Sequence, residues 1–180
     1  MAPGCYAIPR MPRLTSGRPH RVVLACVVTA LVMAVVGADL NRTLVEMPAW
    51  RIVGPQAWAA FSRHADLGAG HTIYPVLGIG GTLLSVAGAV VFRFSPKRPL
   101  AAALPIYGWA CANIGVMVLT VFAAPIMLSV PGLGNDPIAL ARAFAGFAYW
   151  DGVRAVVGAG GDCAAIWALI ALLRPDAEPA

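Results

Sequence analysis

Four long apolar segments dominate the pattern of hydrophobic and polar positions along the chain. They cover residues 21–40, 71–92, 101–130 and 153–173. Each reaches the roughly 20 residues that a helix needs to cross about 30 Å of hydrocarbon. The pattern predicts an all-α protein, a four-transmembrane-helix bundle over residues 21–173. Residues 1–20 form an N-terminal tail and residues 174–180 a C-terminal tail.

Composition supports a membrane protein. The chain is 59% hydrophobic and 12% charged, whereas a soluble domain carries roughly 25% charged residues. The lipid bilayer is therefore the first predicted partner. The net charge of +5 does not indicate nucleic acid as a partner, because the basic residues flank the apolar segments, where they set membrane orientation.

The distribution of Lys and Arg predicts the topology. Basic residues precede the first segment, join the second to the third and follow the fourth, and such regions are usually cytoplasmic. They are Arg10, Arg13, Arg18, Arg21, Arg93, Lys97, Arg98 and Arg174. We expect a multi-pass protein of the cell (inner or plasma) membrane with both termini in the cytoplasm. A cleaved signal peptide is the alternative for the first segment, since Val36-Gly37-Ala38 resembles a cleavage site.

The two predicted outer loops are rich in aromatic residues. Residues 47–65 mix Trp50, Trp58 and Phe61 with arginines, and residues 138–150 hold two Phe, a Tyr and a Trp. Trp and Tyr are enriched at membrane interfaces. Both loops are therefore predicted to contain amphipathic helices that lie at the membrane surface.

One acid, Asp162, lies near the middle of the fourth segment. A charged side chain at the bilayer centre costs about 2.5–3.5 kcal/mol by insertion scales. We expect Asp162 to be neutral, inside the bundle and hydrogen-bonded to Asn113, Thr82 or Thr29. Such a group suits a general acid or base, or a proton carrier. The alternative is a structural hydrogen bond between helices.

A second polar cluster is predicted at the outer boundary, where three helix ends meet in an antiparallel bundle. Its members are Asp39, Asn41, Arg42, His71, Tyr74, Trp150, Asp151 and Arg154. They would surround the mouth of a pocket above Asp162 and, together with Asn113, bind a hydrophobic small-molecule substrate. The alternative is ordinary anchoring at the interface.

The sequence does not favour a metal site. The four cysteines, Cys5, Cys26, Cys111 and Cys163, form no C-x-x-C pair, which argues against zinc and against thiol redox chemistry. The stretch RHADLGAGH (residues 63–71) has the residue types of a two-His-one-carboxylate iron site. On a continuous helix, however, His64 and His71 share a face that Asp66 does not.

Three stretches carry a resemblance to a known family. They are MPAWR (residues 47–51), YPVLGIGGTLLS (residues 74–85) and YWDGVRAVV (residues 149–157). With them the chain resembles the small four-helix membrane proteins grouped with anthrone oxygenases, in which a Trp followed four residues later by Arg opens the final helix. Trp150 and Arg154 match that spacing. Many bacterial members of the family have no known activity.

The resemblance implies an oxidoreductase that converts an anthrone or related polyketide into a quinone with dioxygen, without metal or flavin. Asp162 or His71 would be the base, and Arg154 or Asn113 would hold the enolate oxygen. The sequence has no dense set of His residues, so the base stays open. The alternatives are a small carrier, which would need a homo-oligomer, and a non-catalytic subunit of a larger complex.

Overall fold

The computed structural model describes residues 37–96 and 98–173, and the regular structure in these ranges is helical. Residues 37–40 are helical and lead into the π-helix η1 (Asn41–Glu46) and then α2 (Met47–Val53). The next elements are α3 (Pro55–His64), the π-helix η2 (Ala65–Ala69) and α4 (Gly70–Phe94). The chain ends in η3 (Leu100–Ala102), α5 (Ala103–Ser129), η4 (Val130–Leu133) and α6 (Pro137–Leu173).

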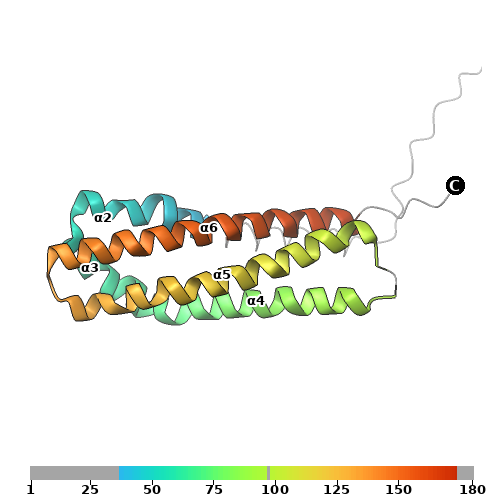
Figure 1. Cartoon of the computed structure of the whole chain (residues 1–180), viewed down its shortest axis with the longest axis horizontal. Helices are drawn as coiled ribbons and strands as arrows, with labels where there is room; N and C mark the ends of the chain where they lie inside the picture. Colours follow the sequence, from blue (N-terminus) through green and yellow to red (C-terminus); the bar gives the residue numbers. More distant parts are fainter. Residues whose placement is uncertain (1–36, 97, 174–180) are drawn as a thin grey trace, which may run out of the picture.

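The three long helices α4, α5 and α6 run lengthwise along the molecule, and α2 and α3 lie at the end where α5 turns into α6 (Figure 1). Three helical stretches are long and apolar enough to cross a membrane: Pro55–Phe94, Leu100–Leu133 and Pro137–Leu173. These stretches indicate a helical membrane protein, as hydropathy predicts. Most of the first predicted span, residues 21–36, lies outside the described residues.

The bounds of two predicted spans are close to those in the structure. Residues 71–92 correspond to α4, and residues 101–130 correspond to α5 with its flanking 3₁₀ turns. Pro125 lies inside α5. Hydropathy locates these helices well because each apolar run is bounded by turn residues or charges.

The second outer loop was predicted wrongly, because residues 138–150 belong to α6 and are not a separate interfacial helix. Asp136 starts this helix early: its carboxylate accepts hydrogen bonds from the backbone N–H groups of Ile138 and Ala139, as an N-cap does. Leu140, Phe144 and Phe147 then recur at helical spacing and are buried. The aromatic residues of this segment thus serve the protein core.

The first outer loop is helical, as predicted, and its helices continue from the end of the first predicted span. The helix does not end at Leu40 but continues through η1 and α2 until Gly54, whose φ of 92° is one that favours glycine. The chain then folds back as α3, which buries Trp58, Ala59 and Ser62 and leaves Phe61 half-exposed. Residues 47–65 therefore form an amphipathic helical hairpin, packed against the first turns of α6.

Two apolar clusters hold the helices together, one at each end. The first joins α2 and α3 to the end of α5 and the start of α6, and includes Met47, Trp58, Met127, Leu140 and Phe144. The second joins α4, α5 and α6 at the opposite end. The Trp50 and Phe144 rings, 6.1 Å apart, fix α2 against α6.

Small residues set the distance between α5 and α6. A Cβ atom added at Gly161 would lie only 2.7 Å from the Cβ of Ala112. An added Cβ would lie at ordinary contact distance, 3.5–3.9 Å, from a side chain of the facing helix at three other glycines: Gly108, Gly115 and Gly158. Close approach at small residues is how membrane helices gain packing energy. The contact at Gly161 also fixes the helical position of its neighbour, Asp162.

We predict that Gly161→Ala destabilises the protein by about 1–3 kcal/mol, because the new methyl group forces α5 and α6 apart. Gly160→Ala is the matched control, since nothing lies within 4 Å of a Cβ at that position. The control should be neutral or raise the free energy of unfolding, because alanine favours helix. Unfolding in a denaturing-detergent titration measures both.

A compensating change tests the same contact. Ala112→Gly removes the methyl group that Gly161→Ala would strike, so the double variant should recover most of the lost stability. Equal stability of the two single variants at positions 160 and 161 would contradict this account of the helix spacing.

Candidate functional site

A buried ion pair lies where the helical hairpin meets α4. The Arg42 guanidinium donates to the Asp66 carboxylate at 2.5 Å, and these side chains are only 9% and 8% exposed. The hydroxyl of Ser62, one helical turn before Asp66, donates to the second carboxylate oxygen. Both oxygens of Asp66 are therefore hydrogen-bonded, as burial of a carboxylate requires.

Aromatic groups complete the surroundings of Arg42. Its guanidinium lies 4.8 Å from the centre of the Tyr74 ring and 5.3 Å from that of Phe147, and it also donates to the Tyr74 hydroxyl at 2.7 Å. Burial lowers the pKa of Arg42, but the charge of Asp66 and the hydrogen bond to it raise the pKa more, so the value lies above the usual one. Arg42 is a fixed positive charge.

A second acid, Asp151, is 1% exposed and neutralised in a similar way. Arg154 donates to one of its oxygens at 2.6 Å, one turn along α6, and the Thr43 hydroxyl donates to the other at 3.0 Å. Since Thr43 follows Arg42, the segment containing these residues is attached to both α4 and α6. Residues 37–53 thus run antiparallel to α6, with Thr43 beside Asp151 and Trp50 beside Phe144.

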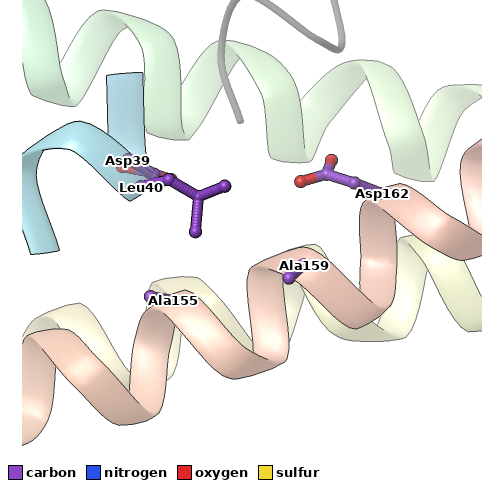
Figure 2. A pocket seen from close by; sticks show the side chains of 5 residues that line it. All are labelled: Asp39, Leu40, Ala155, Ala159 and Asp162. Atoms are coloured by element: carbon purple, nitrogen blue, oxygen red, sulfur yellow. The ribbon is translucent and has the colours of Figure 1, made fainter. Parts of the chain in front are cut away.

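Further along α6, Asp162 and Asp39 line one small crevice with Leu40, Ala155 and Ala159 (Figure 2). In this view the Leu40 side chain lies between the two carboxyl groups. The crevice has a volume of about 10 Å³, which is about the space of one water molecule. Two carboxyl groups from different helices therefore share a confined space with an alanine wall.

The structure divides the predicted boundary cluster into two levels. Arg42, Tyr74, Asp151 and Arg154 lie together in the two ion-pair groups. Asp39 lies one helical turn before them because the helix continues beyond residue 40. The charges of Arg154, Asp151 and Arg42 still reach it, and it also lines the crevice with Asp162.

The other predicted residues have different surroundings. The Asn41 amide donates to Glu46 on an exposed surface. Trp150 stacks on Phe122, with ring centres 5.1 Å apart, and packs against the core. His71 is exposed on the first turn of α4. These three side chains are not brought into the crevice.

The expected neutral partners of Asp162 are bonded elsewhere. The Asn113 amide donates to the carbonyl of Trp109, and the Thr82 hydroxyl donates to the carbonyl of Gly78. Thr29 lies outside the described residues. Asp162 is instead placed by the contact of Gly161 with Ala112, which turns the next residue of α6 toward the crevice.

His71 and Asp162 cannot act on the same atom. Trp109 lies next to both Gly161 and Gly88, so Asp162 is level with Gly88 on α4. The rise of an α-helix then separates that level from His71 by on the order of 20 Å. A site around Asp162 is served by Asp39 and not by His71.

In the described ranges no three His, Cys, Asp or Glu side chains gather as metal ligands. Asp66, the carboxylate of the RHADLGAGH stretch, is occupied by Arg42 and Ser62, and His64 is exposed. Cys111 and Cys163 are free thiols on the surfaces of α5 and α6.

Sequence reasoning missed Asp66, Ser62 and Thr43 as members of the polar groups. Asp66 was considered only as a metal ligand, and its partner Arg42 is 24 positions away along the chain. One signal was available: Ser62 and Asp66 are four residues apart and share a helix face. A buried acid on that face needs a cation, and Arg42 lies in the helical segment that leads into the hairpin.

No family model, curated protein or solved structure matches the chain in the three comparisons.

The arrangement separates two pairs of acids. Asp66 and Asp151 each accept hydrogen bonds from an arginine and from a hydroxyl group. Asp39, which is exposed, and Asp162, which is partly buried, instead line one small crevice with Leu40 and two alanines. Two acids at one crevice are candidates for proton transfer.

We predict that Asp66→Ala lowers the free energy of unfolding by about 3–5 kcal/mol, because it leaves the Arg42 guanidinium buried without its counter-charge. The double variant Arg42→Met, Asp66→Leu should cost far less than the sum of the single changes. A denaturing-detergent titration of the double-mutant cycle measures the coupling.

Asn41→Ala is the control for this prediction, since it removes an exposed hydrogen bond next to Arg42 and should change stability by less than about 0.5 kcal/mol. Additive effects of the two single changes at Arg42 and Asp66 would show that the ion pair does not hold the hairpin to α4.

Proposed function

We propose that the chain is a four-helix integral membrane protein in which residues 21–40 supply the fourth span beside α4, α5 and α6. Both termini and the basic α4–α5 connection face the cytoplasm. The antiparallel run of residues 37–53 along α6 supports this, because the end of the first segment lies beside α6.

The length of α6 supports a position for the membrane. A helix of 37 residues is about 55 Å long, whereas the hydrocarbon core is about 30 Å thick. If residues 153–173 span the hydrocarbon, the first turns of α6 protrude with α2 and α3 on the outer side. Asp151 and Arg154 then lie at the boundary, and Asp162 lies near the middle of the membrane.

Within this frame we propose an oxygenase-like enzyme that oxidises a hydrophobic aromatic substrate of the anthrone type with dioxygen. The observation that carries the proposal is the shared crevice of Asp39 and Asp162. A base is the one protein group that the reaction requires, because an anthrone has an acidic methylene group and its carbanion passes an electron to dioxygen directly.

The proposed reaction balances as anthrone plus dioxygen giving anthraquinone plus water. Asp162 removes a methylene proton, and the carbanion and dioxygen combine into a carbon-bound peroxide. Asp39 donates the proton that makes this a hydroperoxide. Asp39, now a carboxylate, takes the second proton from the same carbon, which breaks the O–O bond and forms the quinone carbonyl. The leaving hydroxide takes the proton held by Asp162 and departs as water.

Arg154 is the proposed partner of the enolate oxygen. It precedes Ala155 of the crevice wall, and Asp151 holds its guanidinium at 2.6 Å. A fixed cation stabilises negative charge that develops during proton removal. The crevice itself has room for one water molecule, so Leu40 must move aside for an aromatic ring to reach Asp162.

The size of the crevice favours a second candidate, a proton-coupled carrier. A crevice that has room for one water molecule and is lined by two acids from different helices suits proton transfer better than the binding of an aromatic ring. In that case Asp162 gains and loses its proton during transport, and a homo-oligomer supplies the remaining spans.

We predict that Asp162→Asn abolishes dioxygen uptake by the purified protein with a simple anthrone, because an amide cannot accept the methylene proton. Asp39→Asn should lower the rate by about 10²–10⁴-fold, the usual contribution of one proton-transfer group. An oxygen electrode measures both in detergent, with the spontaneous rate subtracted.

Cys163→Ala is the matched control, since this exposed residue follows Asp162 on α6 and should retain full uptake. Folded wild-type protein that does not exceed the spontaneous rate would eliminate the oxygenase proposal. Proton-linked flux in proteoliposomes, lost in Asp162→Asn, would then identify the carrier.

A further inference from the structure

A second and much larger groove lies between α4 and α5, close to the connection that joins them. Its volume is about 310 Å³, against about 10 Å³ for the crevice at Asp162. The lining residues are Val86, Ala89, Val90, Arg93, Phe94, Tyr107, Ala110 and Ile114. The surface of the groove is apolar, and Arg93 and Tyr107 line it with the carbon atoms of their side chains.

The groove opens away from the interior of the bundle. On α5, the residues that face α6 include Gly108 and Ala112, and Trp109 lies between Gly88 and Gly161. The groove is lined by other positions of α5, and its residues Val90 and Ile114 are about half exposed. In a membrane-spanning bundle, such a surface contacts lipid.

Positive charge collects at one end of this groove. Arg93 lies in the last turn of α4, and Arg98 donates to the Arg93 backbone carbonyl at 2.8 Å. No Asp or Glu occurs anywhere between Asp66 and Asp136, so neither α4 nor α5 carries an acid that would neutralise these arginines. An apolar groove that ends beside two arginines matches a ligand with a hydrocarbon chain and an anionic head.

We infer that this groove binds an anionic phospholipid, with an acyl chain along the α4–α5 seam and its phosphate at Arg93. A guanidinium pairs with phosphate through two parallel hydrogen bonds. The end of α4 that carries Arg93 lies opposite the hairpin of α2 and α3 (Figure 1). In the proposed topology this end is cytoplasmic, where the membrane surface is negatively charged.

The test is lipid binding to the full-length protein in detergent, followed by native mass spectrometry. The probes are dioleoyl phosphatidylglycerol and dioleoyl phosphatidylcholine, which have the same chains and differ in net charge. Wild-type protein should bind the anionic lipid more tightly. Arg93→Gln should weaken that binding about fivefold and leave phosphatidylcholine unaffected, since one basic side chain contributes about 1 kcal/mol near an anionic surface.

Two comparisons separate this site from general lipid contact: Arg93→Gln with Arg142→Gln, and Val90→Phe with Val91→Phe. Arg142→Gln removes an exposed arginine at the other end of the molecule and should bind like wild type. Val90→Phe fills the groove and should weaken both lipids, whereas Val91→Phe adds the same ring at an exposed position outside the groove.

The proposal requires both differences. If Arg93→Gln behaves like Arg142→Gln, the arginine does not hold the headgroup. If Val90→Phe behaves like Val91→Phe, the groove does not hold the chain. Either result overturns the site, and size-exclusion profiles that match wild type establish that the variants are folded.

Discussion

The ion pair between Arg42 and Asp66 is the interaction on which the rest of the site depends. It joins the segment of residues 37–53 to the start of α4, and the neighbouring Thr43 joins the same segment to Asp151 of α6. In a poorly solvated environment, each partner is costly without the other, so the pair enforces one arrangement more than it adds stability. Asp39 lies one turn before Arg42, and its place beside Asp162 follows from this attachment.

The protein thus uses its acids in two ways. Asp66 and Asp151 have arginine partners and keep the helical hairpin in place, while Asp39 and Asp162 line one small crevice together with Leu40. The close contact of Gly161 with Ala112 contributes to this division because it orients Asp162. The ion-paired acids lie beside the helical hairpin, and the acids proposed to react lie further along α6.

Hydropathy predicts the helical class and the positions of α4 and α5, because a membrane span must be a long apolar run. It fails for α6, where the Asp136 cap and the buried Phe144 and Phe147 extend the helix well before the apolar run begins. The pairing of Arg42 with Asp66 is not readable from composition, since it depends on how the hairpin folds back. The sequence singles out Asp162 as an acid within an apolar run, but its expected partners Asn113 and Thr82 donate to backbone carbonyls.

Infrared spectroscopy of the carboxyl groups tests the central claim, that Asp39 and Asp162 form one proton-binding site, most directly. The protonated-carboxyl band of purified protein is followed as the pH changes, and Asp162→Asn identifies its contribution. Two groups in one confined site titrate together. The account predicts that Asp39→Asn moves the pH at which Asp162 loses its proton, whereas Glu46→Gln does not. An Asp162 titration that is the same with and without Asp39 would contradict it.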